Sequence, residues 1–128
     1  RQQGMRLDAY AEAARRFVWN ELADWYVEAV KPRLAQPGAD RETARRVLVQ
    51  VFDQGLRLLH PIMPFVTEAL WQRLPSQTPG AFLAVAPWPR ARANGADAGI
   101  AFDAVREAID AIRGLRAEYG VQPGTPIK

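Results

Sequence analysis

Two prolines three residues apart, inside an otherwise apolar stretch, constrain the fold of this chain more than any other feature. The stretch covers residues 56–71 and reads LRLLHPIMPFVTEALW. A residue that precedes a proline disfavours the helical region, so one helix should end near Leu59 or His60. Pro64 has a fixed backbone angle and no N–H, which suits the first turn of the next helix. The sequence therefore predicts two apolar helices joined by a Pro-x-x-Pro corner.

A long amphipathic helix is expected before this corner, from about Met5 to Arg33. Its apolar residues recur three or four apart, at Leu7, Tyr10, Ala14, Val18, Leu22, Trp25 and Ala29. Pro32 predicts a kink or a termination in the last turn. After a loop, Asp40 is a candidate N-cap for the second helix.

The second and third helices follow from the same periodicity. The second should be the most buried, because its apolar face is broad and comprises Ala44, Val47, Leu48, Val51, Phe52, Leu56, Leu58 and Leu59. The third helix should begin near Pro64, end before Pro75 and bury the stripe of Val66, Leu70 and Leu74.

A Pro/Gly-rich connector over residues 75–100 separates these helices from a last one. The connector contains a possible extended piece at residues 81–86 and an Asn94-Gly95 turn. Helical spacing then runs from Phe102 to Tyr119, and Gly120 stands where helices usually close. The predicted fold is all-α, an antiparallel bundle of about four main helices.

Composition sets limits on this fold and its surroundings. The 128 residues suit a single domain, 1–128, and 48% hydrophobic residues argue against disorder. The chain has no cysteine, which excludes disulfides and thiolate metal sites, and no apolar run is long enough to cross a membrane. Because both ends look cut and residues 121–128 read as an extended tail, we expect part of a longer cytoplasmic protein.

No catalytic or metal site is predicted. The single histidine, His60, is expected to pack or to cap a helix rather than to act as a base. No serine or threonine stands beside a second histidine, and no metal-ligand spacing occurs. The Gly95-to-Gly99 segment lacks the preceding strand and third glycine of a dinucleotide loop, which favours a flexible turn.

Basic and aromatic residues give the one binding signal. Arg15 and Arg16 stand beside Phe17 and Trp19, within about one helical turn. Proteins that bind single-stranded RNA hold phosphates with arginines and stack bases on aromatic or guanidinium planes. Trp25 and Trp71 are expected in the core, whereas Trp19 and Trp88 fit the stripes less well and are expected to be exposed. Further charge comes from Arg73, Arg113 and Arg116. The alternative is a set of ordinary solvated arginines.

Three separated blocks resemble one family in the same order. The first is FVWNELADWYVE at residues 17–28, followed by Lys31, and the second is residues 58–71. The third runs from Trp88-Pro89 across the connector to IRGLRAE at residues 112–118 and Val121-Gln122-Pro123. Together they resemble the anticodon-binding helical domain of valyl-tRNA synthetases. Ala23 and Ala69 depart from the family pattern, and the ATP-site motifs of class I synthetases are absent.

The resemblance implies a share in aminoacylation of valine tRNA. ATP with Mg²⁺ would bind a catalytic domain elsewhere in the same synthetase chain, and no cofactor is expected here. This domain would hold the anticodon stem-loop, with Arg15, Arg16, Phe17 and Trp19 as principal contacts and Arg73, Arg113 and Arg116 as secondary ones. Two alternatives remain: the equivalent domain of an isoleucyl- or leucyl-tRNA synthetase, or a structural helical module that binds a protein and never RNA.

Overall fold

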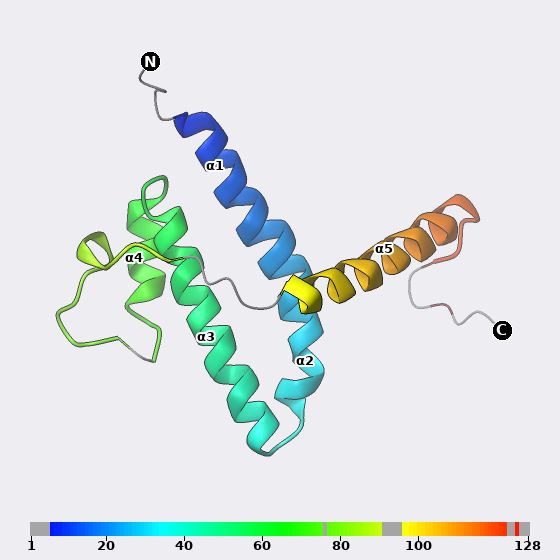
Figure 1. Cartoon of the computed structure of the whole chain (residues 1–128), viewed down its shortest axis with the longest axis horizontal. Helices are drawn as coiled ribbons and strands as arrows, with labels where there is room; N and C mark the ends of the chain where they lie inside the picture. The colour runs from blue at the N-terminus through cyan, green and yellow to red at the C-terminus, as the bar shows by residue number, and fades with distance from the viewer. Residues whose placement is uncertain (1–5, 76, 91–95, 123–124, 126–128) are drawn as a thin grey trace. The chain divides into compact units, whose positions relative to one another are not determined.

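The computed structural model describes residues 6–75, 77–90, 96–122 and 125, with the side chains of 96–98 left aside. Every element within those ranges is helical (Figure 1), which confirms the all-α prediction. The chain forms two compact units, Arg1–Arg90 and Ala91–Lys128. Of the described helices, none combines the length and the apolar character that crossing a membrane requires.

One long helical rod forms the start of the first unit. It comprises α1 (Leu7–Arg16), η1 (Phe17–Tyr26) and α2 (Val27–Ala35), which follow each other without a break, from blue to cyan in Figure 1. The predicted bounds differ by two residues at each end. Pro32 lies inside α2, and the helix ends three residues later at Ala35.

The middle of the rod is wider than an α-helix. η1 is a π-helix, and the N–H of Val27 donates to the carbonyl of Leu22, five residues back. The buried positions of the rod, Ala14, Leu22 and Val30, are eight residues apart, and the half-buried Val18 and Tyr26 lie midway between them, which fits the wider turns. Ala29 is exposed. Its prediction as a core position is wrong, because a repeat of 3.6 residues does not allow for the extra residue in η1.

Helix α3 (Ala39–Leu59) turns back and packs against α1, α2 and α4. Gly38, with φ of 136°, precedes it, and no side chain caps its first turn. The prediction of Asp40 as N-cap is therefore wrong: its carboxylate instead accepts a hydrogen bond from Arg33 Nε at 2.9 Å. The glycine takes the cap position, and the ion pair fastens the turn between α2 and α3.

Four residues of α3 are buried, more than in any other described element. They are Ala44, Gly55, Leu56 and Leu59. A methyl group placed on Gly55 would meet Leu22 Cδ2 at 3.5 Å and Val18 Cγ2 at 3.7 Å, so the rod and α3 approach closely here. The helix thus has the largest number of buried residues, as expected, although Val47 and Phe52 of its predicted apolar face stay 42% and 37% exposed.

The Pro-x-x-Pro corner takes the predicted form. The N–H of Met63 donates to the Leu59 carbonyl at 3.0 Å, and α4 (Pro64–Trp71) begins at Pro64. Thr67 is fully buried, and its hydroxyl is satisfied there because it donates to the Met63 carbonyl at 2.8 Å. His60 Nδ1 lies 2.8 Å from the same hydroxyl. Since that hydroxyl proton is already used, we assign the His60 proton to Nδ1, and the histidine is structural, as predicted.

This anchoring rotates α4 relative to the prediction. Thr67 and Trp71 face the core, whereas Val66 and Leu70 are 44% and 47% exposed. The predicted stripe of Val66, Leu70 and Leu74 is therefore wrong in its first two members. Hydrophobicity alone favoured valine over threonine at the buried position, because the partners of the Thr67 hydroxyl are invisible in that pattern.

The connector is fastened to α4 by a carboxylate. Both oxygens of Glu68 accept the N–H of Leu83, at 3.0 and 3.1 Å, at the start of the short helix η2 (Leu83–Val85). Leu83 is buried against Leu56 and Trp71. Residues 81–86 thus contain one helical turn flanked by extended residues, and the predicted Asn94-Gly95 turn lies outside the described residues.

The second unit contains one long helix, α5 (Ala96–Glu118). Asp103 pairs with Arg106 at 3.4 Å and Asp110 with Arg113 at 3.8 Å along its surface. Gly120 adopts φ of 65°, and the N–H of Val121 reaches the Arg116 carbonyl at 2.8 Å, which confirms the predicted closure.

Candidate functional site

The four principal predicted RNA contacts lie together on the rod, where α1 passes into η1. Arg15 and Arg16 form the last turn of α1, and Phe17 and Trp19 belong to the first turn of η1. All four are exposed, and the indole of Trp19 is 47% exposed, as predicted for a stacking residue. π-helical turns are rare and occur often at functional sites, so their position here agrees with that prediction.

Arg15 and Trp19 line one small hollow, which we call the Trp19 hollow. Its volume is about 270 Å³, and its other walls are α1 residues and the corner residues Leu59, Ile62 and Met63. Arg15 donates to Glu12 through Nη2 at 2.8 Å and Nε at 3.2 Å. That hydrogen bond holds the pKa of Glu12 below its usual value, so the pair stays ionised. A phosphate would compete with Glu12 for this guanidinium.

Arg16 differs from its neighbour in having no ion pair with any residue in the described ranges. Its side chain is exposed, and neither it nor Phe17 lines the Trp19 hollow. In the structure, Arg15 and Trp19 therefore line the same hollow. Arg16 does not line it, but an anion that binds Arg16 would displace no carboxylate.

The secondary predicted contacts are more scattered. Arg73 is exposed just after α4, in the first unit. Arg113 and Arg116 belong to α5 in the second unit. Arg113 pairs with Asp110, and Arg116 Nη2 donates to the carbonyls of Gln122 and Thr125 at 2.7 and 2.9 Å. Arg116 thus holds the chain that follows α5, a role the sequence did not indicate.

Trp19 also lines a second hollow, which is apolar and has a volume of about 370 Å³. Residues of η1, α3 and α4 line it, among them Leu22, Phe52, Met63 and Leu70. Trp19 lines both hollows, as do Leu59 and Met63, and its indole is 47% exposed. A ring held in this way can present a flat surface to a base.

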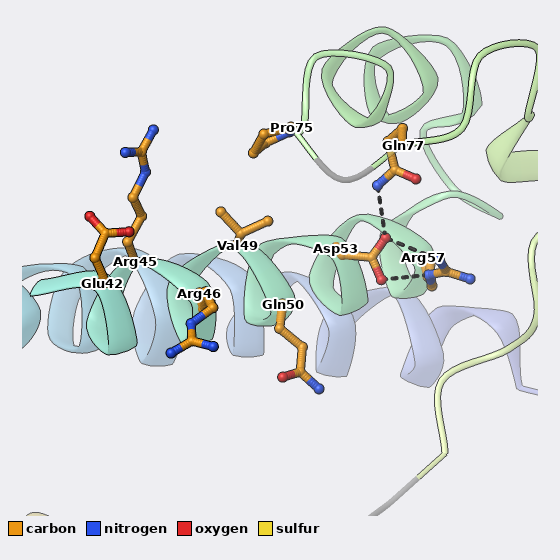
Figure 2. A pocket seen from close by; sticks show the side chains of 9 residues that line it. All are labelled: Glu42, Arg45, Arg46, Val49, Gln50, Asp53, Arg57, Pro75 and Gln77. Carbon is orange, nitrogen blue, oxygen red and sulfur yellow. Dashed lines mark hydrogen bonds and ion pairs between the residues drawn. The ribbon is translucent and has the colours of Figure 1, made fainter. Parts of the chain in front are cut away.

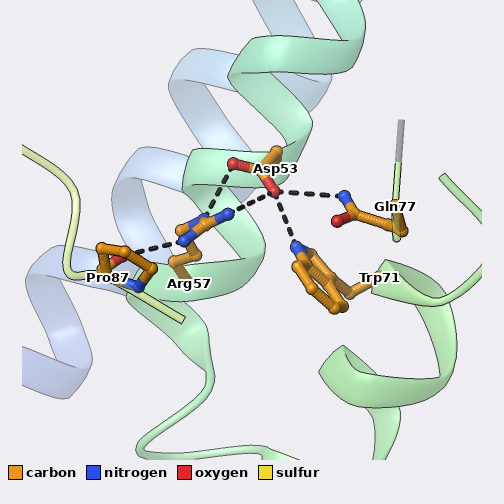
Figure 3. A network of polar contacts seen from close by, with 5 residues as sticks. All are labelled: Asp53, Arg57, Trp71, Gln77 and Pro87. Atoms are coloured by element: carbon orange, nitrogen blue, oxygen red, sulfur yellow. Dashed lines mark hydrogen bonds and ion pairs between the residues drawn. The ribbon is translucent and has the colours of Figure 1, made fainter. Parts of the chain in front are cut away.

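Asp53 on α3 forms the most connected polar group in the first unit (Figure 3). It accepts hydrogen bonds from Arg57 at 2.8 and 3.1 Å, from Trp71 Nε1 at 2.6 Å and from Gln77 at 3.4 Å. Arg57 also donates to the Pro87 carbonyl at 2.9 Å. We call these residues the Asp53 clasp. Its members join α3, the end of α4 and the connector, which takes part through Gln77 and Pro87.

Electrostatics keep the clasp charged. Burial raises the pKa of Asp53, but hydrogen bonds from Arg57, Trp71 and Gln77 and the charge of Arg57 outweigh it, so the pKa lies below its usual value. The Arg57 guanidinium also lies 5.7 Å from the centre of the Trp71 ring, within cation–π range. The prediction that Trp71 packs in the core is confirmed, and its indole N–H has a partner.

Sequence reasoning missed a second basic feature, on α3. A hollow of about 500 Å³, which we call the α3 hollow, opens beside this helix (Figure 2). Arg45, Arg46 and Gln50 line it from α3, and Pro75 and Gln77 line it from the connector. The adjacent arginines fall outside the apolar stripe of the helix, which is the signal that could have found them.

Among the residues that the structure describes, no group of histidines or carboxylates could hold a metal ion. The candidate features of the first unit are thus the α3 hollow with its unpaired arginines, the Trp19 hollow, which Asp8, Glu12 and Arg15 line, and the exposed indole of Trp19. Such an arrangement suits an anionic partner that also offers flat rings.

Comparisons with known proteins agree with this character. Residues 2–128 match the family described as the anticodon-binding domain of tRNA ligase. The chain is similar to valine–tRNA ligases, with 48% identity to that of Carboxydothermus hydrogenoformans over 91% of the chain. Identity is 43% to that of Thermosynechococcus vestitus over 93% of the chain, and 40% to that of Geobacter sulfurreducens over 98%. In each case the chain spans 14% of the relative's length.

Proposed function

Since this chain belongs to the family of anticodon-binding domains of tRNA ligases, we propose that it holds the anticodon stem-loop of a tRNA for a longer valine–tRNA ligase. The single observation that carries the proposal is the match of residues 2–128 to that family. The complete protein would activate valine with ATP and transfer it to its tRNA. ATP and Mg²⁺ would bind a catalytic domain outside this chain, and the enzyme would work in the cytoplasm.

The chemistry of the Trp19 hollow supports the proposal. An unpaired anticodon base can stack on an exposed ring, and each stacked base contributes about 1–3 kcal/mol. Trp19 offers such a ring, and Phe17 offers a second one nearby, 39% exposed. Arg15 and Arg16 would hold the adjoining phosphates, with Arg16 contributing more because it leaves no carboxylate partner behind.

Arg73, Arg113 and Arg116 would add electrostatic attraction without reading bases. Arg116 already uses Nη2 for two backbone carbonyls, so its substitution is expected to affect the end of α5 as well as RNA binding. Arg73 is the better test of a secondary contact, because it makes no ion pair with a described residue.

The assignment to valine rests on the relatives, which are valine–tRNA ligases at 40–48% identity. The equivalent domain of an isoleucyl- or leucyl-tRNA synthetase would have the same role with another tRNA. A structural module that binds protein and never RNA is the alternative of a different class. The exposed and unpaired Arg16 favours RNA over that alternative.

The test is tRNA binding by the full-length protein that carries this chain. Valine tRNA transcripts with the natural anticodon and with altered anticodons are titrated at several salt concentrations. We expect tighter binding of the natural transcript. Equal binding of all transcripts would contradict anticodon recognition, and a preference for isoleucine or leucine tRNA would contradict the valine assignment.

Arg16→Ala serves as the site variant in the same titration. It should weaken binding and flatten the dependence of log K on log salt by about one unit, since one phosphate contact is lost. Arg6→Ala is the matched control. Arg6 is also an exposed arginine near the start of the chain, but it pairs with Asp8. If the two variants behave alike, Arg16 is not a specific contact.

A further inference from the structure

Arg45 and Arg46 are adjacent cations of the first unit that line one hollow and that the proposed anticodon contacts do not use. Arg6, Arg15 and Arg33 each have a carboxylate partner, and Arg57 is held by Asp53. Arg45 and Arg46 are exposed and make no ion pair with any residue of the described ranges, although both line the α3 hollow. Two arginines that stay unpaired in one hollow leave their guanidinium donors available to an anion.

The carboxylates of the α3 hollow do little to cancel this charge. Asp53 is already engaged by three side chains, as Figure 3 shows, and its charge is matched by that of Arg57. Glu42 remains, and it projects beside Arg45 in Figure 2, whereas Arg46 points away from it. The unmatched groups are thus two guanidiniums against one carboxylate.

From these groups we infer that the α3 hollow binds the phosphate backbone of RNA, at a place separate from the Trp19 hollow. The inference rests on the proposed function, which supplies the RNA. Arginine presents a planar fork of donors that matches phosphate oxygens, and Gln50 adds a neutral donor at the same wall. No aromatic residue lines this hollow, so it lacks the rings that the Trp19 hollow offers to a base, and phosphate is the group that its arginines fit best.

The position along α3 supports a separate contact. Gly55 marks where α3 meets Val18 and Leu22, next to Trp19 in the rod. Arg45 precedes Gly55 by ten residues. At a rise of 1.5 Å per residue, the α3 arginines lie about 15 Å further along the helix axis. The two hollows are therefore expected to hold different parts of the RNA.

The test compares two double variants of the full-length protein that lower its net charge equally. R45A/R46A removes the α3 arginines, and alanine is well tolerated at exposed helix positions. R6A/K31A removes two exposed cations that pair with Asp8 and Glu28 away from the hollow. R45K/R46K keeps the charge and loses the planar fork. Far-ultraviolet circular dichroism checks that every variant keeps its helices.

R45A/R46A is expected to reduce the slope of log K against log salt by about 0.7–0.9 per arginine. Because backbone contacts carry no sequence information, transcripts with natural and altered anticodons should lose affinity by the same factor. R45K/R46K should keep most of the slope, and R6A/K31A should keep nearly all of it.

Three results would overturn the inference. A slope unchanged in R45A/R46A, with anticodon preference intact, removes the α3 hollow but leaves the proposed function standing. Equal losses in both double variants mean that only net charge matters. If the unaltered full-length protein binds no tRNA, the proposed function and the α3 contact fail together, and the free arginines would then be tested against an acidic protein segment.

Discussion

Replacing Asp53 by alanine tests whether the clasp holds the first unit together. The substitution removes the acceptor of Trp71 Nε1, which is buried, with the whole residue only 3% exposed. It also leaves Arg57 without its ion-pair partner, in a place where both side chains are about 20% exposed. The expected result is a less stable first unit with unchanged helical bounds.

The magnitude follows from those two losses. A buried donor left without a partner costs about 1–3 kcal/mol. The Arg57 pair, partly screened by solvent, adds about 1 kcal/mol. The free energy of unfolding should thus fall by about 2–4 kcal/mol. With a urea m-value of about 2 kcal/mol/M, the unfolding midpoint moves down by about 1–2 M. The assay is urea unfolding of the chain, followed by circular dichroism at 222 nm.

The same residue predicts a pH dependence. Because the folded-state pKa of Asp53 is depressed, the unfolded chain binds the proton more readily. The stability from Asp53 is fully present above the unfolded pKa of about 3.9 and is lost as pH falls through the folded pKa. Asp53→Asn keeps an acceptor oxygen for Trp71 but cannot ionise, so this part of the acid loss should vanish.

Asp8→Ala is the control, because Asp8 also pairs with an arginine but is exposed. Its unfolding midpoint should match that of the unaltered chain. If Asp53→Ala moves the midpoint no further than Asp8→Ala does, the clasp is not a stabilising contact. If Asp53→Asn keeps the full acid dependence, the Asp53 carboxylate is not its source.

Three further predictions concern single positions. Trp19→Ala should weaken tRNA binding by about 1–3 kcal/mol, a factor of roughly 5–150, in an anisotropy titration; Phe65→Ala, where the ring is 90% exposed on α4, should not. Gly55→Ala should raise the free energy of unfolding by up to about 1 kcal/mol, and with it the urea midpoint, because the added methyl group fits at 3.5 Å from Leu22. Gly55→Leu should lower both. Gly120→Ala should cost about 1–2 kcal/mol at the end of α5, since φ of 65° strains any side chain, and faster amide exchange at Val121 would reveal it.

The ends of two helices could be predicted from single residues that restrict or relax the backbone angles. Pro64 starts α4 and Gly120 closes α5, because a fixed ring angle and a positive φ act within one turn. Thr67 was missed as a core residue, since its burial depends on partners in the corner. Ala29 was expected in the core and is exposed, because the π-helical turns of η1 leave no clear mark in hydrophobic spacing.

The candidate site was predictable to a smaller extent. The Arg15–Trp19 neighbourhood follows from positions four apart on one helix, and in the structure both residues line one hollow. The α3 hollow depends on which arginines find carboxylates, and its far wall comes from Gln77, which follows Gln50 by twenty-seven residues. Pairing over such separations is set by tertiary packing, so the sequence alone pointed to Arg73, Arg113 and Arg116 and did not indicate Arg45 and Arg46.

The wide turns of η1 give the rod a rotational offset. Each residue of an α-helix turns the chain by about 100°, so one surplus residue rotates everything before it relative to everything after. Since both α1 and α2 pack against α3, the offset in η1 fixes the direction in which Arg15 points. Deleting one residue within Phe17–Tyr26 would rotate α1 relative to α2 by about 100°, so the contacts of both with α3 could not be kept together.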